Sequence, residues 1–247
     1  MGVSVDISII VPVYNEADNV LPLANEVSAA MKQQPRSWEL IFVDDASTDN
    51  TSERIREASR HFPNVRGLKH ARNSGQSAAL WTGILATTSP VIATLDGDLQ
   101  NDPADLPRML AELERVDFVC GNRAKRHDSS IRKISSRVAC AARRSALKAD
   151  FADTGCALRV FKRSTLEGVL PFNGWHRFLP VLVHGNGART LEVPVNHRPR
   201  IAGVSKYGLW NRLWRGIYDL IGVGWYQKRR LRPVPFEELK DVESLNR

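Results

Sequence analysis

The chain has 247 residues, of which 43% are hydrophobic and 25% are charged, and its formal net charge is +8 at pH 7. This composition excludes a disordered chain, a disulfide scaffold and a collagen-like fibre, and it allows a sizeable core. The charge is uneven: residues 1–122 hold 10 basic and 17 acidic side chains, whereas residues 123–247 hold 25 basic and 10 acidic ones. The basic second half predicts an anionic partner (nucleic acid, a phosphate substrate or a membrane surface), or else only a solvated surface.

Apolar runs alternate with helical patterns in the first half of the chain. Strands are predicted at residues 7–13, 40–43, 65–68 and 91–95, and helices at about 16–32, 50–61 and 75–87. Short apolar strands with helical crossovers are typical of an α/β fold, with a mostly parallel sheet and helices on both faces. Ligands of such sheets bind beyond the carboxyl ends of the strands. Polar side chains follow three of the predicted strands there.

The second half continues with mixed elements. We expect a helix at 102–114, strands at 116–120, 156–161 and about 189–195, helical segments at 129–149 and about 175–184, and an amphipathic helix at 208–230. The three cysteines form no CxxC pair, which favours a reduced, cytosolic compartment and argues against zinc. No window of about 20 apolar residues occurs, so no segment is predicted to cross a membrane.

Two carboxylates follow directly on the fourth predicted strand, at Asp96 and Asp98, with Gly97 between them. In a loop that bends at glycine, both can converge on one ion. Carboxylate oxygens suit Mg²⁺ or Mn²⁺ held together with substrate phosphates, and Gln100 can add a carbonyl oxygen. The alternative is a capped turn, since aspartate is common in turns. The position after a parallel strand favours the metal site.

Asp44 and Asp45 end the second predicted strand. A carboxylate at this position can accept hydrogen bonds from a nucleobase N–H or from ribose hydroxyls. The alternative is capping of the following helix, before which Ser47 and Asp49 also lie. We expect both roles, on different residues.

Seven motifs in order carry a resemblance to a known family. SIIVPVYNEADN (8–19), IFVDDASTDNT (41–51), ARNSGQSAALWTGI (71–84) and ATLDGDLQNDP (93–103) resemble the family 2 glycosyltransferases, which have the Rossmann-like GT-A fold. GNR (121–123), DTGCALRVFKR (153–163) and RPRIAGVSKYG (198–208) narrow the resemblance to polyprenyl-phosphate glycosyltransferases of the dolichyl-phosphate mannose synthase type. The resemblance covers about residues 6–230. We expect a catalytic domain at 1–207, an interfacial helix at 208–230 and a polar tail at 231–247.

The resemblance also implies roles for individual residues. The donor-binding residues are Pro12, Tyr14, Glu16, Asp44 and Asp45. The ligands of Mg²⁺ or Mn²⁺ are Asp96, Asp98 and Gln100. The phosphate-binding residues are Arg123, Arg132, Arg200 and Lys206, and the residues at the reaction centre are Asp96, Asp98, Asp153 and Arg123.

The implied reaction is inverting transfer of a sugar from a GDP- or UDP-linked donor to undecaprenyl or dolichyl phosphate, at the cytoplasmic face of the membrane. A phosphate acceptor is already anionic near neutral pH, so it needs no strong base. Three roles therefore stay open for Asp153: orienting an arginine or the sugar hydroxyls, acting as a base, or capping a turn. The alternative function is transfer to a saccharide hydroxyl in cell-envelope polysaccharide or lipopolysaccharide synthesis. Nucleic acid is not expected as a partner, because an acidic pair at the sheet edge is unsuited to it.

The stretch at 208–230 combines helical apolar spacing with Trp210, Trp214 and Trp225 and a basic cluster at 228–230. These features are typical of a helix in the headgroup layer, and the charged residues exclude a membrane span. The alternative is a core helix packed on the sheet. The resembled enzymes often carry transmembrane helices after this point, so docking on a separate small integral membrane protein is a hypothesis.

The remaining basic groups are interpreted as structural or solvated. Arg143, Arg144 and Arg163 are expected to be solvated surface charges. His176, His184 and His197 lack the spacing of metal ligands and are expected to be structural or polar loop residues.

Overall fold

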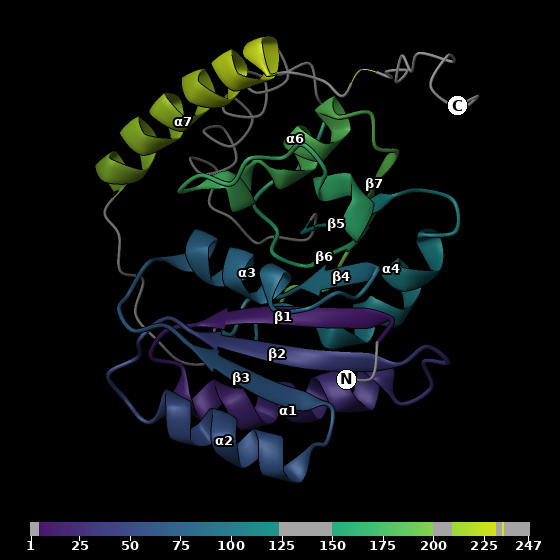
Figure 1. Ribbon diagram of the computed structural model, residues 1–247, viewed down its shortest axis with the longest axis vertical. Helices are drawn as coiled ribbons and strands as arrows, with labels where there is room; N and C mark the ends of the chain where they lie inside the picture. The colour runs from purple at the N-terminus through teal and green to yellow at the C-terminus, as the bar shows by residue number, and fades with distance from the viewer. Residues whose placement is uncertain (1–4, 124–149, 200–208, 231–233, 235–247) are drawn as a thin grey trace, which may run out of the picture.

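The computed structural model describes residues 5–123, 150–199, 209–230 and 234, with the backbone alone for 209–217. Within these residues the centre of the fold is a seven-stranded sheet of order β3-β2-β1-β4-β6-β5-β7 (Figure 1). The strands are β1 (Ile7–Val13), β2 (Trp38–Asp44), β3 (Val65–Lys69), β4 (Val91–Thr94), β5 (Phe118–Asn122), β6 (Arg159–Lys162) and β7 (Thr190–Pro194). Only β6 runs antiparallel to its neighbours in this described sheet. The expectation of a mostly parallel sheet is confirmed.

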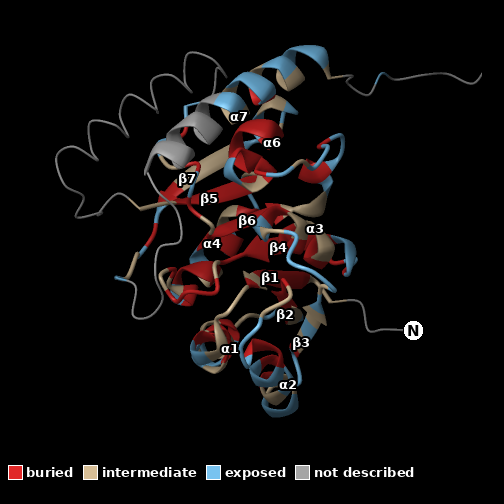
Figure 2. Ribbon diagram, turned by 90° about the vertical axis from the view of Figure 1, so that its left-hand side faces the viewer, coloured by how far each residue is buried: buried red, intermediate tan, exposed pale blue. Residues whose placement is uncertain are grey.

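Helices cover both faces of the sheet, which is why its strands are nearly continuous apolar runs. On one face, Ile7 and Ile9 pack with residues of α1 (Ala17–Met31), α2 (Thr51–His61) and α4 (Leu106–Glu112). On the other face, Ile10 packs with α3 (Gln76–Leu85) and α6 (Leu179–Gly185). Figure 2 shows the sheet as a buried layer between these helices.

Two predicted helices are shorter than expected. The helix predicted at 102–114 begins as the 3-10 turn η1 (Pro103–Asp105), and α4 follows it. The helix predicted near 175–184 is divided into the 3-10 turn η3 (Trp175–Arg177) and α6. Pro180 lies in the first turn of α6, where the missing N–H of proline costs nothing. The helix predicted at 129–149 lies outside the described residues.

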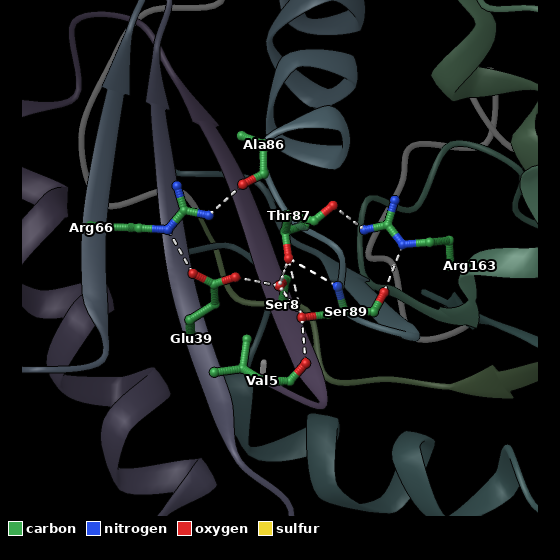
Figure 3. Close-up of polar contacts among 8 residues, drawn as sticks. All are labelled: Val5, Ser8, Glu39, Arg66, Ala86, Thr87, Ser89 and Arg163. Atoms are coloured by element: carbon green, nitrogen blue, oxygen red, sulfur yellow. Dashed lines mark hydrogen bonds and ion pairs between the residues drawn. The ribbon is translucent and has the colours of Figure 1, made fainter. Parts of the chain in front are cut away.

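A polar cluster closes the amino-terminal end of the central strands (Figure 3). Ser8 Oγ on β1 lies 2.6 Å from Glu39 Oε1 and 2.8 Å from Ser89 Oγ, and Arg66 Nε donates to Glu39 Oε2 at 2.6 Å. Arg163, in the 3-10 turn η2 (Arg163–Leu166), donates to the carbonyls of Ser89, Thr87 and Ile84. The interpretation of Arg163 as a solvated charge is therefore wrong, because its guanidinium binds the turn before β4.

Helix α7 (Leu209–Arg229) lies against the second half of the fold. Val223 is buried there, and the Tyr226 hydroxyl donates to the Gly168 carbonyl at 2.9 Å and accepts from the Leu170 N–H at 3.2 Å. Gln227 Nε2 donates to the Val181 carbonyl at 3.2 Å. Among the described helices, none combines the length and apolar character that a membrane-crossing segment needs.

Candidate active site

The loops after β1 and β2 meet at the carboxyl end of the sheet and are tied to each other. Thr48 N–H donates to Asn15 Oδ1 at 2.8 Å, and Asn15 N–H donates to Ser47 Oγ at 2.9 Å. Glu16 N–H donates to Thr51 Oγ1 at 2.9 Å. The predicted donor residues Pro12, Tyr14 and Glu16 all lie at this junction, and each is half-buried.

Backbone strain gathers at the same edge. Asn15, Ala46 and Leu99 adopt positive φ values of 55°, 59° and 59°, and they follow β1, β2 and β4 respectively. The left-handed region is costly for Ala46 and Leu99, whereas Asn15 tolerates it as an asparagine, and such strain concentrates at functional sites. Three loops that converge at one edge therefore share a feature typical of a binding site.

Asp44 is almost fully buried and is used by its own loop. Its carboxylate accepts from the Ser47 N–H at 2.8 Å and from the Ser52 hydroxyl. The side chain is 1% exposed. The carboxylate thus fixes the turn between β2 and α2, but it does not cap α2, whose N-cap residue Asn50 makes no side-chain cap hydrogen bond.

Asp45 joins a different loop to the sheet. Its carboxylate accepts from the Ser74 N–H at 2.8 Å and from the Gly75 N–H at 2.7 Å, and it lies 2.7 Å from His70 Nδ1. His70 Nε2 in turn lies 2.9 Å from Thr82 Oγ1 on α3. Asp45 therefore holds the segment that leads into α3.

The carboxylate pair predicted to bind a metal lies in the loop after β4. Asp96 Oδ1 accepts from Gln76 Nε2 at 2.8 Å, and Asp98 Oδ1 accepts from the Gln100 N–H at 3.2 Å. Gly97 lets this loop approach β1, since a Cβ there would lie 2.7 Å from Val13 Cγ1. The loop that carries both carboxylates therefore packs against the end of β1.

The pKa of Asp96 is raised to about 6, first by burial and then by the negative charge of Asp98. Arg159, Arg123 and the Gln76 amide oppose this rise. Two carboxylates that repel each other at a half-buried edge are a suitable donor set for a divalent cation, which would relieve the repulsion. The described residues contain no group of three or more His, Cys, Asp or Glu side chains that could hold a metal. A Mg²⁺- or Mn²⁺-type site would thus complete its shell with waters and substrate phosphates.

Arg123, directly after the end of β5, forms a bidentate ion pair with Asp153. Arg123 Nε donates to Asp153 Oδ2 at 2.7 Å, and Nη2 donates to Oδ1 at 2.9 Å. The two side chains are 13% and 17% exposed. The N–H of Asp153 also donates to Glu192 Oε1 at 2.7 Å, which anchors the loop to β7. Of the three roles left open for Asp153, this geometry favours orienting an arginine.

Sequence reasoning missed two residues at this edge. Gln76 lies inside the motif at 71–84 and contacts Asp96 directly, but no role was predicted for it. Arg159 on β6 is 3% exposed, donates through Nη2 to the Thr154 carbonyl at 3.0 Å, and has a buried Nε without a hydrogen-bond partner. The sequence does mark Arg159, because a charged residue within the otherwise apolar run LRVF (158–161) is unusual and indicates a buried charge with a specific role.

The predicted phosphate-binding residues Arg132, Arg200 and Lys206 lie outside the described residues. Arg198, two positions before Arg200, donates to Glu26 at 2.7 Å and pairs with Asp102 at 2.8 Å. Its N–H donates to the Gln100 carbonyl at 2.9 Å. The chain is therefore tied at residue 198 to the loop that carries the carboxylate pair.

The protein has an α/β fold, and its candidate site lies at the carboxyl ends of the parallel strands. Comparison with known proteins identifies its family. The family described as glycosyl transferase family 2 matches residues 8–170, about two thirds of the chain. The chain belongs to this family, and the resemblance inferred from its motifs is confirmed. It is therefore a glycosyltransferase.

Curated relatives support the narrower resemblance. The chain is 40% identical over 239 residues to dodecaprenyl-phosphate galacturonate synthase of Rhizobium johnstonii, covering 94% of this chain and 70% of that protein. It is 35% identical over 217 residues to undecaprenyl-phosphate 4-deoxy-4-formamido-L-arabinose transferase of Aeromonas hydrophila, covering 87% of this chain and 66% of that protein. Both relatives are thus substantially longer than the matched segment.

Solved structures share the fold at low sequence identity. Glucosyl-3-phosphoglycerate synthase of Mycobacterium tuberculosis, in complex with Mn²⁺, UDP and phosphoglyceric acid, matches with a TM-score of 0.67 and 16% identity, covering 92% of this chain and 80% of that one. The mannosyltransferase PcManGT of Pyrobaculum calidifontis, in complex with GDP-Man and Mn²⁺, matches with a TM-score of 0.59 and 21% identity, covering 94% and 66%. These matches confirm the GT-A fold.

Proposed function

We propose that this glycosyltransferase moves a sugar from a nucleoside-diphosphate donor to a polyprenyl phosphate, with inversion. The observation that carries the proposal is 40% identity, across 94% of the chain, to a relative named for a dodecaprenyl-phosphate product. The second relative is named for an undecaprenyl-phosphate acceptor.

The donor half of the reaction is assigned to the loops after β1, β2 and β4. Pro12, Tyr14 and Glu16 line the junction proposed to hold the nucleoside, and Asp96 and Asp98 are proposed to hold a Mg²⁺ or Mn²⁺ ion, with Gln100 beside them. When bound, such an ion supplies positive charge to the departing diphosphate. The raised pKa of Asp96, caused by burial and by Asp98, supports a site built for a cation. Asp44 and Asp45 shape these loops in addition to any donor contact.

The acceptor half is assigned to the basic side of the same edge. Asp153 occupies the Nε/Nη2 edge of the Arg123 guanidinium with both of its oxygens, so the Nη1/Nη2 edge is the one proposed to bind phosphate oxygens. A carboxylate engaged in this way is a poor base. A phosphate monoester needs no proton removed before it attacks, whereas a saccharide hydroxyl does. The pairing thus favours a lipid phosphate over the saccharide hydroxyl of the alternative function.

We further propose that α7 lies on the cytoplasmic face of a membrane. Tyr218, Ile221 and Trp225 form an apolar stripe on the side of α7 that faces away from the body, with exposures of 80%, 67% and 65%. Lys228 and Arg229 end the helix with positive charge. An apolar stripe with aromatic residues beside cationic ones suits the headgroup layer of an anionic bilayer. This location would bring a soluble donor and a lipid acceptor to the same edge.

The test is transfer of a radiolabelled sugar into an organic-extractable product. A panel of UDP- and GDP-linked sugars is incubated with undecaprenyl or dolichyl phosphate and Mn²⁺. We expect label in the organic phase with one donor, loss of that label with EDTA, and recovery on adding excess Mn²⁺. Label that enters only a water-soluble saccharide would support the alternative function instead.

A further inference from the structure

Gln76, the residue that contacts Asp96, lies between two anchors at the start of α3. On one side, Asp45 accepts hydrogen bonds from the N–H groups of Ser74 and Gly75. On the other side, Ser77 is held by the turn at residues 174–176. The first turn of α3 is therefore fixed immediately before and after Gln76.

The second anchor consists of three contacts to Ser77. The Gly174 N–H donates to Ser77 Oγ at 2.8 Å, and the Trp175 indole N–H donates to the Ser77 carbonyl at 3.2 Å. His176 Nδ1 lies 2.7 Å from Ser77 Oγ. Gly174 has a φ of 99°, so the turn requires glycine at this position.

The hydrogen-bond directions follow from the charge of His176. Burial, then Arg159 and Arg177, lower the pKa of His176 to about 3, so its imidazole is neutral near pH 7. Because Ser77 Oγ already accepts from Gly174, its own hydrogen is free to donate to His176 Nδ1. His176 Nδ1 is then an acceptor and Nε2 carries the proton. Ser77 Oγ thus accepts from the Gly174 N–H and donates to His176 Nδ1, and these two hydrogen bonds fix its orientation.

We propose that His176 and Ser77 are positioning residues for the metal-binding carboxylate Asp96. They fix the first turn of α3, and that turn holds the Gln76 amide against Asp96 Oδ1. This inference rests on the proposed function, since it takes Asp96 as a ligand of the divalent cation. Groups that orient a metal ligand through hydrogen bonds affect metal affinity by about 10- to 100-fold when they are removed.

The experiment measures Mn²⁺ binding to the full chain, by electron paramagnetic resonance of free Mn²⁺ with UDP or GDP present. S77A removes the hydroxyl, H176L removes the acceptor, and H176N keeps an acceptor oxygen near the position of Nδ1. Q76L breaks only the last contact, on an exposed side chain that the fold does not need. The matched control is S89A, which cuts a buried hydroxyl network at the opposite end of the sheet (Figure 3).

We expect Q76L, S77A and H176L to weaken Mn²⁺ binding by about tenfold, and H176N and S89A to stay within about twofold of the wild type. Equal losses in H176N and H176L, or a wild-type dissociation constant in Q76L, would overturn the inference. If S77A and H176L fail to fold, H176Q takes their place, since its longer side chain moves the acceptor away from Ser77 Oγ, and a wild-type dissociation constant in H176Q would overturn the inference. A wild-type chain that binds no Mn²⁺ with either nucleotide would instead contradict the proposed function.

Discussion

The pair formed by Arg123 and Asp153 gives the clearest test of the role assigned to the acceptor side. D153N keeps the shape of the side chain but removes its charge, and it turns one acceptor oxygen into a donor that faces Arg123 Nη2 or Nε. The pair has two charge-assisted hydrogen bonds of 2.7 and 2.9 Å, and the side chains are 13% and 17% exposed. If Asp153 holds Arg123 in its productive orientation, loss of this contact raises the activation free energy by about 2 kcal/mol. That increase corresponds to a roughly 30-fold lower turnover.

The assay is turnover against pH for wild type, D153N, R123A and the double variant. If Asp153 acts only by holding Arg123, D153N lowers turnover by the same factor at every pH. The double variant is then no slower than R123A alone, because both changes remove one contact. An acid limb that disappears in D153N, or losses that add in the double variant, would refute the positioning role and favour a base.

Three further predictions address separate parts of the chain. The pKa of His176 is about 3 in the folded chain, whereas an unfolded histidine has a pKa near 6.5. The free energy of unfolding therefore decreases as the pH is lowered below about 6.5. Urea unfolding should show that, from pH 7 to pH 5, the free energy of unfolding of the wild type decreases by about 2 kcal/mol more than that of H176N. A difference between the two proteins that does not change with pH would contradict this. G97A should weaken Mn²⁺-dependent transfer at least about tenfold by pushing its loop off β1, and unchanged activity would show that the close packing is unnecessary. Replacing both Ile221 and Trp225 with alanine should weaken binding to anionic vesicles about 30-fold. The control L85A removes a leucine that is as exposed as Ile221 and should leave vesicle binding unchanged. Equal effects of the two changes would argue against an interfacial α7.

The parallel half of the sheet was predictable because its strands are buried on both faces. The run at 7–13 has apolar residues in both alternating positions, and β1 has the same bounds. The run at 40–43 marked only the buried part of β2, since Trp38 and Glu39 at its start are half-buried. Burial thus appears in the sequence as apolar character, whereas the polar ends of a strand carry no such signal.

The direction of β6 could not be read from the sequence. An apolar strand pattern is the same in either direction, and pairing between distant segments decides the orientation. Here Phe161 on β6 stacks on Phe118 of β5 with ring centroids 5.3 Å apart. The sequence placed this strand at 156–161, whereas it spans Arg159–Lys162.

The site shows the same division between local and long-range information. The pair at Asp96 and Asp98 was predictable, because both residues directly follow a buried strand. The contact between Gln76 and Asp96 was not, because it joins the start of α3 to a loop 20 residues later. The use of Asp45 to bind the N–H groups before α3 also depends on tertiary folding. Carboxylates at strand ends can therefore build loops as well as bind ligands.

The chemical linkage in the product distinguishes transfer to a lipid phosphate from transfer to a hydroxyl. Undecaprenyl phosphate is incubated with the accepted nucleotide sugar and Mn²⁺, and the lipid product is examined by mass spectrometry and ³¹P NMR. We expect a gain of one anhydro-sugar unit and conversion of the phosphate monoester signal to that of a diester, with the anomeric configuration inverted relative to the donor. A sugar joined to a hydroxyl, with the lipid phosphate still a monoester, would contradict the proposed function.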